Sequence, residues 1–160
     1  MEKLNSLLSK AEEWFCALGF VFATALMFLN VILRYVFNAG IPWSEELIRY
    51  IIIWATFIGI GLLARKEAHV SIDFFAAFMS KKNQKYMTLF ADLVSIVFCL
   101  MMIYYSWDTV GKQIATAQKS PALQLPFYVV YFCLPLGFAL GVLRFSQHFY
   151  STLKDEGGEQ

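Results

Sequence analysis

Apolar residues gather in four long runs that are separated by shorter polar segments. The runs comprise residues 14–33, 47–64, 86–107 and 120–143. Charged residues inside them are confined to Arg49 in the second run and Asp92 in the third. A helix rises about 1.5 Å per residue, so about 20 residues cross a hydrocarbon core of about 30 Å. Because backbone polar groups in lipid must be satisfied within the chain, the runs predict transmembrane helices.

The pattern therefore predicts an all-α integral membrane protein with a single membrane domain over residues 1–160. We expect four transmembrane helices, at residues 14–33, 44–64, 86–107 and 121–143. Residues 144–160 are expected to form a cytoplasmic tail. The third helix is expected to extend outward past residue 107, since only Gly111 interrupts good helix formers before Ser120-Pro121. Within the fourth helix, Pro135 should free the carbonyl of Tyr131 and kink the helix.

Two further segments have helical patterns but are too short to cross a membrane. Residues 1–13 carry leucines at helical spacing with Lys and Glu between them. Residues 71–80 are rich in Phe, begin at Ser71, which can cap a helix, and have basic residues on both sides. Both segments are predicted to be helices that lie in the membrane interface.

The distribution of Lys and Arg predicts the orientation of the chain. The N-terminal segment, the 65–85 loop and the C-terminal tail together hold nine basic residues, and the other side of the membrane holds four. The nine are Lys3, Lys10, Arg65, Lys66, Lys81, Lys82, Lys85, Arg144 and Lys154, and the four are Arg34, Arg49, Lys112 and Lys119. The positive-inside rule then places both termini in the cytoplasm.

Composition narrows the class of protein further. Of the 160 residues, 59% are hydrophobic and 16% are charged, against about 45–50% and about 25% in soluble domains. The formal net charge is +1, so no basic excess points to nucleic acid. The composition argues against a soluble domain, a disordered chain and a nucleic-acid binder, and membrane lipids are the expected surroundings. The three cysteines lie inside the runs without a CxxC spacing, which favours small packing residues.

Candidate chemistry is sparse along this sequence. His69 and Asp73 stand at i, i+4, but two ligands without a third make a poor metal site, so a surface helix pair is favoured. Motifs of phosphate loops, nucleophile elbows and metalloproteases are missing, so we expect neither an enzyme nor a cofactor in this chain. Asp92 is the one candidate for a proton relay; a structural role, as the partner of a nearby base or of a helix end, is favoured.

Small residues recur at a spacing that allows helices to approach closely. Gly137 and Gly141 are four residues apart in the fourth run, and Ala55 and Gly59 are four apart in the second. Such spacing permits tight helix packing in membranes. We therefore expect these positions to lie in helix–helix contacts.

The turn between the first two predicted helices concentrates charged and aromatic side chains. Arg34 and Tyr35 end one helix, and Trp43, Glu45, Glu46 and Arg49 begin the next. The charges suit the dipoles of the two helix ends, and Asn38 and Gly40 are turn formers. Arg34 can bridge to either glutamate, and Glu45 and Arg49 have the supportive i, i+4 spacing. A capped hairpin explains the charges; the aromatic residues favour a site at which a partner docks.

Six segments of the chain together resemble a known family. The segments are Asn30 to Asn38, Trp43 to Glu46, Trp54 to Gly59, Arg65 to Asp73, Ser120 to Pro126 and Leu134 to Gly137. They resemble the small membrane subunit of TRAP transporters (tripartite ATP-independent periplasmic transporters), the DctQ-like or Q subunit. The resemblance covers nearly the whole chain.

The resemblance implies a role that the residues by themselves do not specify. Such systems import organic acids, including dicarboxylates and sialic acid, with a sodium gradient and a periplasmic substrate-binding protein. A large elevator-type membrane subunit carries the solute and the sodium ions, and the small subunit packs beside it in the bacterial inner membrane. The expected role is therefore a non-enzymatic scaffold subunit, with Arg34 to Glu46 facing the binding protein. The alternatives are a small oligomeric proton-coupled exporter that uses Asp92, and a membrane anchor of a redox enzyme.

Overall fold

The chain folds into five helices over the residues that the structure describes. The structure, a computed structural model, describes the backbone of residues 2–76 and 81–154 and the side chains of residues 9–62 and 83–154. The helices are α1 (Glu2–Val36), α2 (Ser44–Ala76), α3 (Lys81–Thr116), α4 (Phe127–Tyr131) and α5 (Cys133–Lys154). Within the described ranges, β-pairing is limited to an isolated antiparallel bridge between Lys119 and Pro126. The predicted all-helical class is confirmed.

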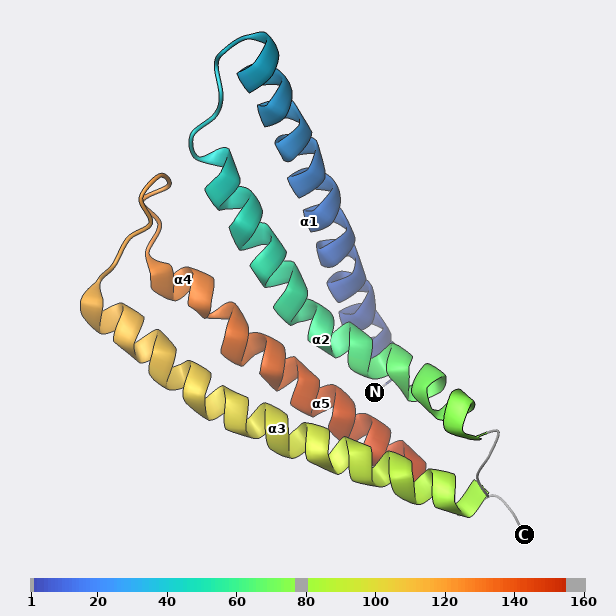
Figure 1. The fold of residues 1–160 in the computed structure, drawn as a ribbon. Coiled ribbons are helices and arrows are strands. Elements are labelled where there is room, and N and C mark those ends of the chain that lie inside the picture. Colours follow the sequence, from blue (N-terminus) through green and yellow to red (C-terminus); the bar gives the residue numbers. More distant parts are fainter. Residues whose placement is uncertain (1, 77–80, 155–160) are drawn as a thin grey trace.

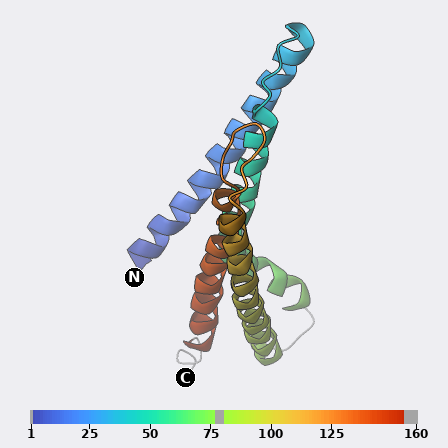
Figure 2. The same cartoon turned by 90° about the vertical axis from the view of Figure 1, so that its left-hand side faces the viewer.

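The helices form two antiparallel pairs that meet in the middle of the molecule (Figure 1). α1 packs with α2, and α3 packs with α5, while α2 and α5 join the two pairs. The pairs diverge toward the end that carries the α1–α2 turn and the α3–α4 loop, which we call the outer end (Figure 1). The opposite end, where α5 finishes, we call the inner end; Figure 2 shows that α1 is inclined to the other helices there.

Three helical stretches are long and apolar enough to cross a membrane, counting the described residues only. They are Ser9–Val36, Asn83–Thr116 and Phe127–Lys154, the last of which combines α4 and α5. The described side chains of α2 end at Leu62, and its first turns carry Glu45, Glu46 and Arg49. A fourth crossing through α2, and the orientation with both termini inside, stay predictions.

The two predicted interfacial helices are not separate elements. α1 runs without a break from Glu2 through the predicted boundary at residues 13–14, and α2 continues past residue 64 to Ala76. The reason is that neither junction contains a proline or a glycine, so nothing stops the helix. Residues 77–80 of the predicted 71–80 helix lie outside the described residues.

The last two predicted helices differ from the structure in their bounds. α3 extends outward to Thr116, as predicted, and also begins five residues earlier than predicted, at Lys81. The fourth predicted helix begins at Phe127 rather than 121 and continues to Lys154, so residues 144–154 are helical instead of a tail. A single non-helical residue, Phe132, separates α4 from α5. Pro135 explains this break because it has no amide hydrogen to donate to the Tyr131 carbonyl.

Close packing of α5 against α2 and α3 forms the core of the molecule. A Cβ added at Gly137 would collide with the carbonyl oxygen of Phe57, so only glycine allows this approach. The Phe138 ring makes edge-to-face contacts with Phe57 of α2 and Phe98 of α3, with centroids 5.7 and 6.3 Å apart. Gly141 is buried as well. Both glycines therefore lie where α5 packs closely against its neighbours, at the positions for which their spacing predicts helix contacts.

The second small-residue pair behaves differently at its two positions. Ala55 is buried in the core, and its carbonyl accepts a hydrogen bond from the Cys16 thiol. An added Cβ at Gly59 would meet no atom within 4 Å, so this glycine is not in a close helix contact. The prediction holds for Ala55 and is wrong for Gly59. Cys99 and Cys133 are free and buried in the packed interior, in agreement with their predicted packing role.

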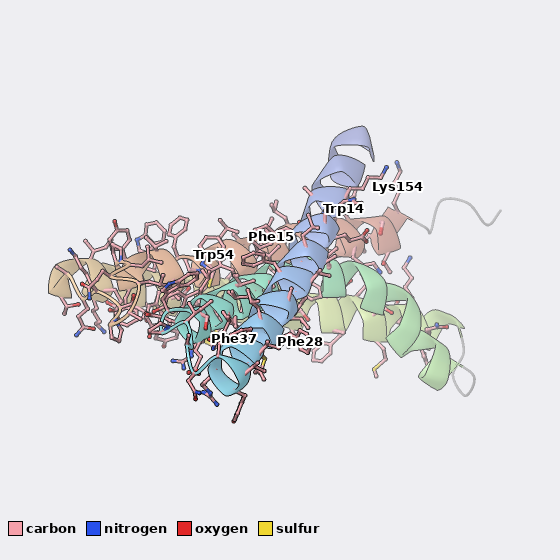
Figure 3. All side chains as sticks on the ribbon, turned by 90° about the horizontal axis from the view of Figure 1, so that it is seen from above. Trp14, Phe15, Phe28, Phe37, Trp54 and Lys154 are labelled. Atoms are coloured by element: carbon pink, nitrogen blue, oxygen red, sulfur yellow. The ribbon has the colours of Figure 1, made fainter. Side chains whose placement is uncertain are left out.

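Wide apolar faces remain uncovered on the two flanking helices. On α1, Trp14, Val21, Phe28 and Tyr35 recur every seven residues, and Phe28 is 67% exposed. Figure 3 shows Trp14, Phe15 and Phe28 along α1, where it crosses over the helices beneath it. On α3, Tyr104 is 74% exposed and stands among further apolar residues. Such faces are expected to meet lipid or another membrane subunit rather than water.

Candidate functional site

The α1–α2 turn at the outer end is closed by the backbone of the helix that precedes it. The Ala39 amide donates to the Leu33 carbonyl at 3.0 Å, and Asn38 has a φ of 51°, in the left-handed region. Asn tolerates this conformation better than most residues do. The predicted role of Asn38 is confirmed. Gly40 has a negative φ and rests beside the aliphatic part of Arg34, so its role is not conformational.

Side-chain hydrogen bonds fix the second half of this turn. The Asn30 side-chain oxygen accepts from the Ile41 amide at 2.7 Å. The Ser44 side chain is fully buried, and its hydroxyl donates to the Ile41 carbonyl at 2.8 Å. The sequence reasoning missed the function of Asn30. An asparagine inside the first apolar run, one turn before the predicted end of that helix, was the available signal.

The outward side of the turn carries the predicted docking residues. Arg34 forms an ion pair with Glu45 at 3.7 Å, and the two side chains are 55% and 69% exposed. The Arg34 guanidinium also lies 5.1 Å from the centroid of the Tyr35 ring. Trp43 and Arg49 are exposed nearby. Of the two glutamates that Arg34 was predicted to reach, the structure pairs it with Glu45; docking of a partner here stays a prediction.

Glu46 faces the opposite way, toward the loop between α3 and α4. Its Oε2 accepts hydrogen bonds from the amides of Ala122 and Leu123, each at 2.9 Å. Its Oε1 accepts a hydrogen bond from the Tyr50 hydroxyl. Hydrogen bonds to an ionised carboxylate are stronger than those between neutral groups. Glu46 therefore joins α2 to a segment more than 70 residues away.

The α3–α4 loop, residues 117–126, is ordered by its own hydrogen bonds as well. The Ser120 amide donates to the Leu125 carbonyl at 2.8 Å, and the Leu125 amide donates to the Ser120 hydroxyl at 3.1 Å. Ser120 is fully buried. Ala117 and Gln124 have φ values of 48° and 55°, which are unfavourable for residues with a Cβ. The third helix, which was expected to stop at Ser120-Pro121, therefore ends earlier, at Thr116. Ser120 and Pro121 lie within the compact loop that follows.

A cavity of about 650 Å³ lies between this loop, α4 and the first turns of α2. Pro42 of the α1–α2 turn and Pro121 of the α3–α4 loop both line it, together with Glu46, Arg49 and Tyr131. The two connections therefore lie on either side of one opening at the outer end. Their arrangement suits recognition of a partner by charged and aromatic side chains.

A buried ion pair joins α1 to α5 toward the inner end. The Arg144 Nη2 atom lies 3.1 Å from Glu12 Oε2 and donates to the Ser9 hydroxyl at 3.0 Å. The Glu12 and Arg144 side chains are each only 6% exposed. The sequence predicted Glu12 within an interfacial helix and Arg144 in the cytoplasmic tail, so it did not bring the two residues together. The sequence did contain a signal for this pair. Glu12 and Arg144 carry opposite charges, each lies just beyond an apolar run, and both are predicted on the cytoplasmic side.

Asp92 has a basic partner, His148, on the neighbouring helix. The His148 Nδ1 atom lies 2.7 Å from Asp92 Oδ2. Asp92 is buried, whereas His148 is partly exposed. The contact links α3 to α5 on the inner side of Cys99. The contact with a nearby base, which the favoured interpretation of Asp92 includes, is present; the relay role of Asp92 stays a hypothesis.

The other predicted site residues cannot be placed in the same way. The side chains of His69 and Asp73 lie outside the described residues, so their pairing stays a prediction. Among the residues that are described, no three or more His, Cys, Asp or Glu side chains gather as a metal site would require.

Comparison with known proteins identifies the family. The family model described as "Tripartite ATP-independent periplasmic transporters, DctQ component" matches residues 23–155. A small permease protein assigned to TRAP transporters in Haemophilus influenzae is 32% identical over 132 residues, which cover 82% of this chain and 81% of that protein.

Two longer relatives match as well. They are the isethionate TRAP transporter permease protein DctMQ of Oleidesulfovibrio alaskensis, at 28% identity, and the sialic acid TRAP transporter permease protein SiaT of Haemophilus influenzae, at 30%. The matches cover 68% and 64% of this chain but only 17% of each relative. Since the family model covers most of the chain, the resemblance seen in the sequence is confirmed, and the chain belongs to the DctQ family of TRAP transporter small permease subunits.

Proposed function

We propose that this small permease subunit is a non-enzymatic scaffold of a sodium-coupled TRAP transporter that imports an organic acid. The proposal rests on one observation: the buried polar side chains pair with one another inside the chain, whereas the exposed faces of two helices are apolar. Glu12 with Arg144, and Asp92 with His148, join helices of this chain to one another. The apolar faces of α1 and α3 point outward. Such an arrangement stabilises a wall of helices and offers its surface to another membrane subunit.

The proposed main partner is the large elevator-type permease subunit. Matches of this chain to DctMQ and SiaT cover only 17% of those permease proteins, so each contains a much longer additional part. We identify that part with the large subunit and propose it as the main partner of this chain. Sodium ions and the solute would bind there, and the apolar face of α1 or α3 would pack against its scaffold.

The proposed second partner is the periplasmic substrate-binding protein. The excess of Lys and Arg in the inner segments supports an orientation with both termini in the cytoplasm. The outer end, with Arg34, Trp43 and the α3–α4 loop, would then face the periplasm. Arg and aromatic residues are common anchors of protein interfaces.

Dicarboxylates and sialic acid are the proposed types of solute, and the large subunit and the binding protein would choose between them. Similar small permeases are named for different solutes: ectoine in Halomonas elongata and C4-dicarboxylates in Vibrio cholerae, at 26% and 25% identity to this chain. Similar small subunits in transporters of different solutes support a scaffold role. Family membership also favours this role over the proton-coupled exporter and the redox anchor.

Gentle detergent purification of the chain from its native host tests the proposal. The large permease subunit should co-elute in a constant ratio, and cross-linking followed by mass spectrometry should place it against α1 or α3. Recovery of the chain only as a complex with itself, or with a redox enzyme, would refute the scaffold role.

A further inference from the structure

We propose that Glu46 is a positioning residue that shapes the 117–126 loop into a docking surface for the periplasmic binding protein. This inference rests on the proposed function, because it assumes that the outer end meets that protein. The sequence grouped Glu46 with the outward charges of the α1–α2 turn. The structure instead turns it inward, toward a loop on the other helix pair.

The contacts of Glu46 show how it acts on the loop. Two successive amides, those of Ala122 and Leu123, converge on one carboxylate oxygen at 2.9 Å. Tyr50, one turn further along α2, donates to the other oxygen and fixes the side chain from behind. Consecutive amides that converge in this way form a concave site for an anion. Glu46 supplies that anion from within the chain.

The backbone conformation of the loop indicates that the contact with Glu46 stabilises it. Ala117 and Gln124 hold left-handed backbone conformations, which are costly for residues with a Cβ. Ala122 itself is exposed, and the Glu46 carboxylate ties its amide and that of Leu123 to α2. Removing the carboxylate would leave the two amides to water. The loop would then sample other shapes, because its strained residues would lose part of what holds them in place.

The 117–126 loop, when bound by Glu46, forms one surface together with the α1–α2 turn. Pro42 of the turn and Pro121 and Ala122 of the loop line one cavity, so the two connections are neighbours across its mouth. Trp43 on the turn and Leu125 on the loop are large apolar side chains that remain partly exposed. Arg34 and Lys119 add exposed positive charge. Exposed aromatic and apolar residues with a charged surround are the features of a protein-docking surface.

Hydrogen exchange in the assembled transporter tests the first half of the inference. In Glu46→Gln, the amides of Ala122 and Leu123 should exchange roughly tenfold faster or more, because the bond to a charged acceptor is lost. Glu45→Gln is the matched control, since Glu45 is adjacent but pairs with Arg34 at the surface. Equal protection of the two amides in wild type and Glu46→Gln would overturn the inference. Glu46→Ala serves as the second variant, and its assembly is checked by co-purification of the large subunit.

Uptake by proteoliposomes tests the second part of the inference, that the loop docks the binding protein. The concentration of loaded binding protein that gives half-maximal uptake should rise several-fold in Glu46→Gln, with a smaller change in the maximal rate. Asp108→Asn is the control, because Asp108 is an exposed carboxylate at the outer end that pairs with Lys112 on its own helix. A fall in the maximal rate alone would show a merely structural role and overturn docking.

The two readouts also separate this inference from the proposed function. If uptake by the wild-type complex does not depend on a binding protein, the proposed function fails, whatever the exchange rates show. If the wild type depends on it and Glu46→Gln exchanges and transports as the wild type does, only the role of Glu46 fails.

Discussion

The inner and outer ends of this molecule both use a carboxylate to connect segments distant in sequence, but in different ways. At the inner end, Glu12 meets Arg144 inside the packed helices, and both side chains are nearly inaccessible. At the outer end, Glu46 is only partly buried and binds backbone amides of a loop. The first contact joins two helices; the second determines the shape of a loop. Damage to the inner contact should therefore appear in stability, and damage to the outer one in recognition.

The largest effect is expected from Arg144→Ala. Removing one partner of a buried ion pair leaves the other charge uncompensated and costs about 3–5 kcal/mol in soluble proteins. The melting temperature of the purified complex should fall strongly. The double variant Glu12→Gln with Arg144→Met should recover part of the loss, because it buries no lone charge. A wild-type melting temperature for Arg144→Ala would show that the pair does not hold α1 in place.

A smaller loss is expected from Gly137→Ala in the core between the two ends. The new methyl group would collide with the backbone of Phe57, and overpacking of this kind costs about 1–3 kcal/mol. Gly59→Ala is the matched control; it meets open space and should be neutral or slightly stabilising because alanine favours the helix. Thermal unfolding of both variants measures the difference. Equal destabilisation of the two would contradict the close α2–α5 approach.

Asp92→Asn is expected to have a moderate effect on stability and little effect on transport. Asparagine still fits beside His148 but loses the charge-assisted hydrogen bond, worth about 1.5–3 kcal/mol. Uptake by the assembled transporter should keep most of its rate. Complete loss of uptake with intact assembly would point instead to the proton relay of the exporter hypothesis.

The smallest effect on stability is expected at the exposed pair of the outer end. Arg34→Glu removes an ion pair that is more than half exposed, and ion pairs of this kind contribute little to stability. The melting temperature should hardly change, whereas uptake should weaken if the turn docks the binding protein. The exchanged pair Arg34→Glu with Glu45→Arg sharpens this test. Recovery of uptake in the exchanged pair would indicate an internal role, and continued loss would indicate that a partner reads Arg34.

Local features of the sequence predicted much of the fold. The apolar runs gave the helices, Asn38 the turn, Pro135 the break before α5, and Gly137 the close packing. Each of these follows from backbone chemistry within a few residues. The merging of the short helices into α1 and α2 also follows from local chemistry, since no breaker lies between them, and the prediction missed it.

The long-range polar contacts could not be predicted in this way. Glu12 and Arg144 are 132 residues apart, and Glu46 bonds amides 76 and 77 residues away. Which charged residues meet depends on how the helices cross, and apolar runs that are uniform around the helix do not specify this. The backbone amides that bind Glu46 leave no trace in side-chain patterns at all. As a result, the sequence placed Glu46 in the correct turn, with Arg34 as one possible partner, but could not indicate the amides of Ala122 and Leu123.

The most direct test of the central claim, that this chain is a scaffold rather than a transport pathway, is reconstituted uptake. Proteoliposomes would contain this chain, the large subunit or both, with a sodium gradient and the binding protein loaded with the acid it retains on purification. We predict accumulation of the acid only when both membrane subunits are present, and none with this chain alone. Accumulation against a gradient by this chain alone would contradict the account.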